Sequence, residues 1–173
     1  MKLIPLICQR DIAISKDFTA KLLKDPWVLI CSGFGVGFMP VMPGTWGSIL
    51  GVGLWCVVLS ELEPTLSILV IVLAIAFAWF AIDQTCRAHN VKDEPAIVID
   101  EIVGQWVAVL WVPRSFWAIC LAFLVFRFLD IVKPWPVSWA DSSVPGSLGI
   151  LLDDVIAGIG TCILIHAVIR VVG

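Results

Sequence analysis

The stretch that most constrains this chain is residues 65–82, a run of 18 residues without a charged side chain. As a helix it would be about 27 Å long, close to the roughly 30 Å thickness of the hydrocarbon core of a bilayer. Further apolar runs cover residues 49–60, 102–112, 115–126 and 155–172. This series predicts an all-α fold, a compact multihelical integral membrane bundle with about four to five apolar helices.

Composition supports a membrane protein rather than a soluble one. Hydrophobic residues make up 60% of the 173 residues and charged residues 14%, against roughly 45–50% and 25% in soluble domains. The net charge of -3, without a basic stripe, argues against a nucleic-acid partner. We expect one domain over residues 1–173, with a basic cytoplasmic segment at 1–26 and a membrane core at 27–173. The sequence leaves the oligomeric state open.

Residues 102–126 allow two interpretations. They could form one helix kinked at Pro113, or a helical hairpin whose arms of 11 and 12 residues are each about 17 Å long. With five crossings and the N-terminus inside, the hairpin places nine of the eleven Lys and Arg residues in the cytoplasm. A single helix would move Arg127 and Lys133 outside, so charge favours the hairpin. All polar clusters then lie on the cytoplasmic face.

The first polar cluster is the glycine-rich segment GFGVGFMPVMPGTWGS at residues 33–48. Glycine lets backbone N–H groups approach an anion, and a helix that begins near Thr45 would offer free N–H groups to a phosphate. We therefore consider Gly44, Thr45 and Ser48 candidate phosphate ligands. A plain Pro-Gly turn with a threonine cap is the alternative.

Three further clusters carry acids. Asp100 and Glu101 precede one apolar run, and Asp153 and Asp154 precede another; Asp130 lies three residues after Arg127, on the same helix face. Helix capping or simple ion pairing could explain each cluster alone. Together they bring five carboxylates to membrane-proximal helix ends, where an unpaired charge is costly.

Such a group of acids requires a cation. Hard oxygen ligands without His or Cys favour Mg²⁺, while Arg127 and Lys133 could bind phosphate. A phospholipid head-group enzyme is therefore the preferred interpretation, and a small ion-coupled transporter or channel subunit is the alternative. The predicted metal ligands are Asp100, Glu101, Asp130, Asp153 and Asp154. The predicted catalytic residues are Asp100, Glu101, Asp130, Lys133 and Asp154.

Four strings in order, GFGVGFMPVMPGTWGS, IDEIVGQW, FRFLDIVKPWP and GILLDDVIAG, resemble the phosphatidylglycerophosphatase A family. The resemblance implies an all-helical, Mg²⁺-dependent phosphomonoesterase of the bacterial inner membrane. Its substrate would be phosphatidylglycerophosphate and its lipid product phosphatidylglycerol. It also implies that the family's acids fall on the five carboxylates named above and its base on Lys133. Attack by water and a covalent aspartyl-phosphate remain alternative mechanisms.

Overall fold

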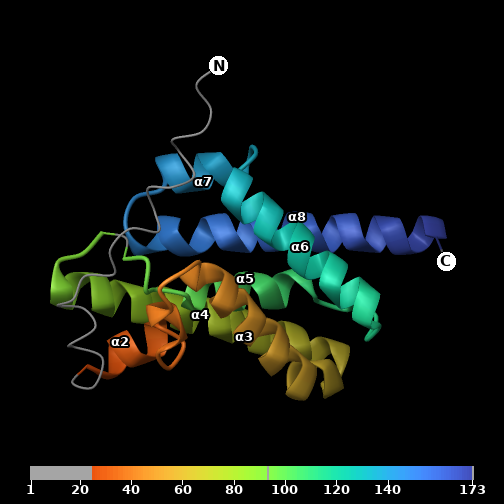
Figure 1. Ribbon diagram of the computed structural model, residues 1–173, viewed down its shortest axis with the longest axis horizontal. Coiled ribbons are helices and arrows are strands. Elements are labelled where there is room, and N and C mark those ends of the chain that lie inside the picture. The colour runs from red at the N-terminus through yellow and green to blue at the C-terminus, as the bar shows by residue number, and fades with distance from the viewer. Residues whose placement is uncertain (1–24, 93, 173) are drawn as a thin grey trace.

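A computed structural model describes residues 25–92 and 94–172. Within these ranges the chain is helical and contains no strand (Figure 1), which confirms the predicted all-α class. Nearly all of the predicted N-terminal cytoplasmic segment lies outside the described residues. The α-helices are α2 (Pro26–Cys31), α3 (Pro43–Val57), α4 (Pro64–His89), α5 (Ile99–Ala108), α6 (Phe116–Val132), α7 (Val137–Ser143) and α8 (Ser147–Val172). Two 3₁₀ turns, η1 (Val36–Phe38) and η2 (Leu59–Glu61), flank α3.

Local sequence sets where the long helices begin. Pro43 and Pro64 occupy the first turns of α3 and α4, where a missing N–H costs no helical hydrogen bond. Glu63 accepts a hydrogen bond from the Thr65 N–H at 3.1 Å, and Ser115 accepts one from the Ala118 N–H at 3.2 Å. These caps satisfy otherwise free donors, so α4 and α6 begin where their apolar runs begin.

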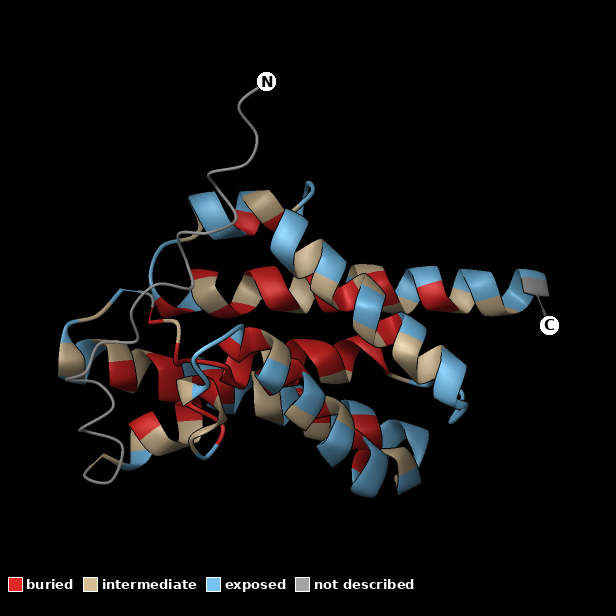
Figure 2. Ribbon diagram, viewed as in Figure 1, coloured by how far each residue is buried: buried red, intermediate tan, exposed pale blue. Residues whose placement is uncertain are grey.

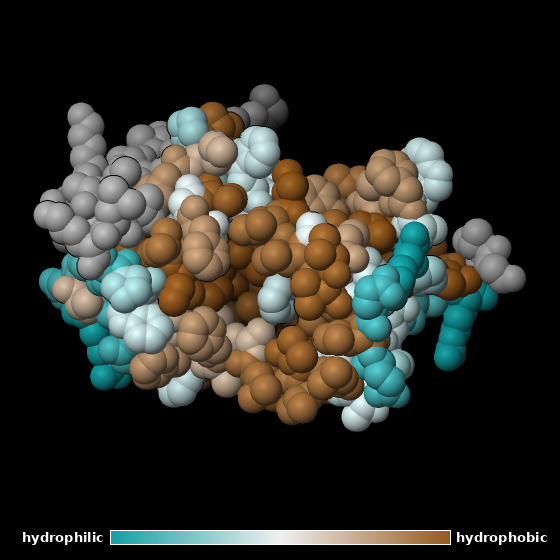
Figure 3. All heavy atoms as spheres, turned by 90° about the horizontal axis from the view of Figure 1, so that it is seen from below, coloured by the Kyte–Doolittle hydropathy of each residue, from teal (hydrophilic) through white to brown (hydrophobic). Residues whose placement is uncertain are grey.

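Three helices of the described chain are long and apolar enough to cross a membrane: α3 with η2, then α4, then α8. Their outer faces carry large apolar side chains, and Val57, Leu73 and Ile163 each leave more than half of their surface exposed. Figure 3 shows one such face, on which apolar side chains form a broad belt between more polar ends. The protein is therefore a membrane protein, and α3, α4, α5, α6 and α8 are its apolar helices.

The hairpin interpretation of residues 102–126 is confirmed and the single kinked helix is wrong. α5 ends at Ala108 and α6 begins at Phe116, with Pro113 and Arg114 in the connection between them. α5 packs against α3, α4, α6 and α8, and most of its residues are buried (Figure 2). It is the short central helix of the bundle, so its length need not match the thickness of a bilayer.

Small residues let α5 and α8 cross closely. A Cβ atom at Gly104 would lie 2.8 Å from the Asp154 carbonyl oxygen, and one at Gly158 would overlap the Gly104 carbonyl oxygen. Glycine at both positions allows backbone-to-backbone contact, as in many membrane helix pairs. The crossing fixes the second turn of α8 against the first turn of α5, near the end of the bundle where α3 begins and α6 ends (Figure 1).

Candidate metal and phosphate site

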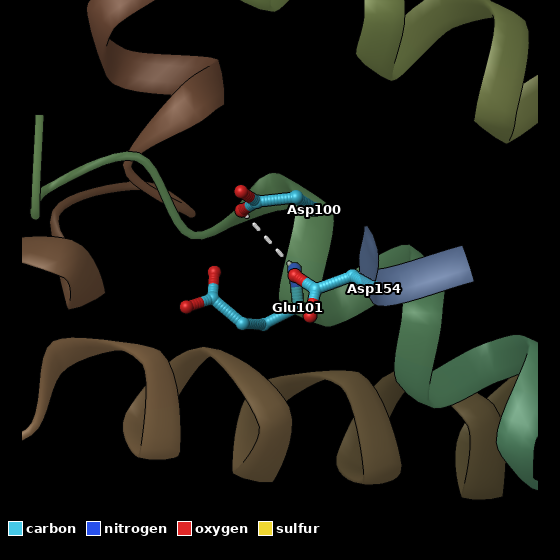
Figure 4. A group of neighbouring side chains, drawn as sticks. All are labelled: Asp100, Glu101 and Asp154. Atoms are coloured by element: carbon cyan, nitrogen blue, oxygen red, sulfur yellow. Dashed lines mark hydrogen bonds between the residues drawn. The ribbon is translucent and has the colours of Figure 1, made fainter. Parts of the chain in front are cut away.

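Three predicted site residues meet where α5 and α8 cross. Asp100 and Glu101 lie in the first turn of α5, and Asp154 lies in α8. Each offers a carboxylate oxygen, and these three oxygens lie within 4.8 Å of one another (Figure 4). Asp100 and Asp154 are buried and Glu101 is partly buried. We call these three residues the carboxylate cluster.

The capping interpretation of Asp153 and Asp154 is wrong. α8 begins at Ser147, so both residues lie inside the helix, beyond the free N–H groups of its first turn. The apolar residues at 148–152 and the left-handed Gly146 start the helix earlier than the charge pattern indicates. Asp100 and Glu101 do occupy a helix start, and the Glu101 N–H donates to Asp100 Oδ1 at 3.1 Å.

Burial dominates the electrostatics of the carboxylate cluster. Loss of solvent, followed by repulsion from Glu101, raises the pKa of Asp100 well above its ordinary value of 3.8. Burial also raises the pKa of Glu101, although the Arg127 guanidinium opposes that shift. Without a bound cation, the positive charge near these two carboxylates is too small to stabilise their ionised forms.

Arg127 of α6 connects this cluster to α3. Its Nη1 atom donates to Asp130 Oδ2 at 2.5 Å, lies 4.0 Å from Glu101 Oε1 and lies 3.5 Å from Ser48 Oγ. The expected side-by-side placement of Arg127 and Asp130 is therefore confirmed. The side chains of both residues are only 13% exposed, so the ion pair is well shielded from solvent.

The first turn of α3 supplies the predicted phosphate-binding segment. Gly44 is buried against the Glu101 carboxylate and the Arg127 guanidinium. The Thr45 Oγ1 atom is buried and has no hydrogen-bond partner, whereas Ser48 Oγ donates to the Gly44 carbonyl oxygen at 3.0 Å. A hydroxyl and a helix start therefore lie beside the guanidinium.

Lys133 lies at the other side of the site. It caps the C-terminus of α6 in a left-handed conformation with φ 48°. Its Nζ atom contacts Asp153 Oδ2 and lies 2.5 Å from Asp141 Oδ1. Two of the five predicted metal ligands, Asp130 and Asp153, thus face cations, while the other three form the carboxylate cluster.

Sequence reasoning missed two residues here. Asp141, on α7, contacts Lys133 from beyond two prolines, and no helical spacing relates the pair. Gln105 follows Glu101 by one turn of α5, and both polar atoms of its buried amide lack partners. A buried, unpaired amide is costly, and glutamine within the apolar run at 102–112 is the one signal that could have revealed it.

The carboxylate cluster fits a hard divalent cation. Glu101 Oε2 and Asp154 Oδ1 are buried without hydrogen-bond partners, and such orphaned oxygens are what Mg²⁺ binds. On the α3 side, Thr45 Oγ1 and Arg127 Nε are also buried and unpartnered, and their types suit a phosphate. The arrangement can hold a cation and an anionic group next to each other.

Fold and site together define a helical membrane protein with a buried acidic centre at one end of its bundle. Residues 29–169 match the family described as phosphatidylglycerophosphatase A. The chain belongs to the phosphatidylglycerophosphatase A family, which confirms the resemblance seen in its motifs.

Three curated relatives are similar to the chain, and two of them carry the family's name. Phosphatidylglycerophosphatase A of Escherichia coli is 37% identical over 147 residues, covering 83% of this chain and 85% of the relative. The Haemophilus influenzae protein of the same name is 35% identical, covering 84% and 90%. A Bacteroides thetaiotaomicron protein named "Putative phosphatidylinositol-3-phosphatase" is 38% identical, covering 84% and 95%. No solved structure matches the chain significantly.

Proposed function

We propose that this protein is a Mg²⁺-dependent lipid phosphatase that hydrolyses phosphatidylglycerophosphate to phosphatidylglycerol and phosphate. The observation that carries the proposal is the adjacency of two sets of buried, unpartnered polar atoms. One set is carboxylate oxygen from Glu101 and Asp154, and the other is the Thr45 hydroxyl and the Arg127 guanidinium. The names of two relatives supply the substrate.

Asp100, Glu101 and Asp154 would hold Mg²⁺. When bound, the ion would neutralise phosphate oxygens and lower the pKa of a coordinated water. Charge supports this role, because the site gathers more acids than bases. The site holds two bases, Arg127 and Lys133, and six carboxylates: Asp100, Glu101, Asp130, Asp141, Asp153 and Asp154. A phosphate monoester, which carries negative charge, would be repelled by that excess.

The remaining residues would bind and orient the phosphate. The Arg127 side chain is fixed by Asp130, and its buried Nε atom has an unused donor for a phosphate oxygen. Thr45 would donate its hydroxyl from the start of α3, where the helix dipole favours an anion. Lys133 would stabilise charge on the phosphate oxygens as the bond to the glycerol oxygen breaks.

The proton and the nucleophile follow from the same groups. Glu101, whose pKa is raised by burial, would accept the proton of an attacking water through a carboxylate oxygen that does not bind the cation. The alternative, attack by an aspartate and formation of an aspartyl-phosphate, places the same water in the second step. Trapping of a phosphoenzyme after rapid acid quench would distinguish the two routes.

We further propose that the protein lies in the bacterial inner membrane with this site in the cytoplasm. At the end of the bundle that holds the site lie Arg87, Lys92, Arg127 and Lys133, whereas Arg114 and Arg170 lie near the other end. This distribution favours an orientation in which the end of the bundle that holds the site faces the cytoplasm.

The alternative function, an ion-coupled transporter or channel subunit, predicts ion flux without phosphate release.

Phosphate release from phosphatidylglycerophosphate in detergent micelles tests the proposal. Purified protein should release phosphate with Mg²⁺, lose the activity in excess EDTA and regain it when Mg²⁺ is restored. Asp154→Asn should lose about 100-fold or more of the activity, and Glu61→Gln, which removes an acid paired with Arg114 away from the site, should match wild type. Folded wild-type protein that releases no phosphate would contradict the proposal.

A second substrate sharpens the test. Because one relative is named for phosphatidylinositol 3-phosphate, that lipid should be assayed in parallel at the same mole fraction. We expect the higher kcat/KM with phosphatidylglycerophosphate. A preference for the inositol lipid would leave the proposed phosphatase chemistry intact and would contradict the proposed substrate.

A further inference from the structure

Lys133 is held by two acids from two different helices. Its Nζ atom lies 2.5 Å from Asp141 Oδ1 on α7 and contacts Asp153 Oδ2 on α8. The Lys133 side chain is 14% exposed and that of Asp153 8%, whereas Asp141 is 35% exposed. The lysine therefore bridges the buried acids and the more open edge of the site.

The two acids differ in what lies behind them. Asp153 is directly joined to the carboxylate cluster, because its Oδ1 atom accepts the N–H of Asp154 at 3.0 Å. Asp141 is outside the carboxylate cluster, on a helix that packs against α8, where buried Val137 belongs to the same core cluster as Ala157. The negative charge on the Asp153 side is consequently larger than on the Asp141 side.

A lysine ammonium at the end of a flexible four-carbon stem moves toward the stronger negative potential unless something opposes it. The backbone of Lys133 is fixed as the cap of α6, but that does not fix Nζ. We propose that Asp141 is a positioning residue, which keeps the Lys133 ammonium away from the carboxylate cluster and in place for the substrate phosphate. The inference rests on the proposed function and adds a residue that none of the family's motifs quoted above includes.

Loss of Asp141 then has a defined consequence. The ammonium would shift toward Asp153 and the carboxylates behind it, where it would leave the phosphate and compete with a divalent cation. Asp141→Asn should lower kcat/KM about tenfold, the effect of removing one charge-assisted hydrogen bond. The loss should appear mainly in KM, and more Mg²⁺ should be needed for half-maximal activity.

A double-mutant cycle with Lys133→Ala tests the inference. If Asp141 acts through Lys133, Asp141→Asn should cost about tenfold in the wild type and nothing further in the Lys133→Ala protein, whose residual rate must be measurable. Asp141→Glu should recover part of the activity. The matched control on α7 is Ser142→Ala, which removes an exposed hydroxyl bonded to the Ser138 carbonyl oxygen and should match wild type.

The outcomes separate the two proposals. Equal losses from Asp141→Asn in both backgrounds, or full activity of Asp141→Asn, would overturn the positioning role while leaving the phosphatase intact. Absence of phosphate release by the wild type would overturn the proposed function and this inference with it. A third outcome is that Asp141→Asn lowers the melting temperature together with the activity and that Asp141→Glu restores neither. This result would show a purely structural role and also overturn the inference.

Discussion

Gly44 lies so close to Glu101 that a Cβ atom at position 44 would overlap Glu101 Oε1. The same atom would lie 3.2 Å from Arg127 Nη1. Three helices thus meet at the Cα atom of Gly44: α3 supplies the glycine, α5 the carboxylate and α6 the guanidinium. The absence of a side chain at Gly44 allows the acid and the arginine to take their places beside the start of α3.

Gly44→Ala should therefore damage the site more than the fold. The crowded groups are the ends of flexible side chains, which can move, but a displacement of about 1 Å costs on the order of 100-fold in rate. We expect kcat/KM to fall by about that factor with little change in melting temperature. Gly53→Ala is the matched control, since a Cβ there meets nothing within 4 Å and alanine should stabilise α3 by about 0.5–1 kcal/mol. Wild-type activity in Gly44→Ala would argue that Glu101 is not needed where it lies.

Thr45→Val separates phosphate binding from packing. Valine keeps the shape of threonine and removes a buried hydroxyl that has no partner in the protein, so stability should stay equal or rise. If the hydroxyl donates to the phosphate, KM should rise about tenfold. Steady-state kinetics with Thr45→Ser, which keeps the hydroxyl, provide the comparison. An unchanged KM in Thr45→Val would remove Thr45 from the site.

Asp153 and Asp154 are neighbours with opposite expected effects on stability. Asp154 Oδ1 has no partner, so Asp154→Asn removes repulsion and should leave the metal-free protein as stable or more stable. Its activity should fall about 100-fold or more, as for loss of a group that stabilises transition-state charge. Asp153→Asn removes a counter-charge from Lys133 and should cost about 2 kcal/mol of stability. Thermal unfolding in detergent without Mg²⁺ would measure both, and equal destabilisation by the two variants would contradict this account.

The raised pKa values of Asp100 and Glu101 predict a pH-dependent stability. Burial and the neighbouring acids raise both pKa values above the ordinary 3.8 and 4.5. The folded state therefore holds protons that the unfolded state releases, and stability in EDTA should decrease as pH rises from those ordinary values through the raised ones. Mg²⁺ binds the deprotonated carboxylates, so its stabilising effect should grow with pH and its binding should release protons.

Melting temperatures measured from pH 4 upward, with EDTA and with Mg²⁺, would test this sign. Asp100→Asn should flatten the EDTA profile, because it removes the carboxyl whose pKa is shifted well above its ordinary value. A metal-free protein that becomes more stable as pH rises over this range would contradict the prediction.

Several features of the fold could be read from sequence because they depend on neighbours along the chain. The apolar runs, the prolines before residues 44 and 65, and the pair Pro113 and Arg114 specified the helices and the hairpin. The Arg127–Asp130 pair was equally accessible, since residues three apart on a helix share a face. The start of α8 at Ser147 is not evident from sequence, because the charges of Asp153 and Asp154 indicate a later start.

The candidate site needed the tertiary structure. The sequence determined that acids, two bases and a glycine-rich turn flank the apolar runs, and hence the chemistry that such groups favour. It could not determine that Asp154 reaches Asp100, or that Asp141 holds Lys133, because these pairs join different helices. Their separation depends on how closely and at what register α5, α7 and α8 cross, and glycines at 104 and 158 permit that approach only once the helices are packed.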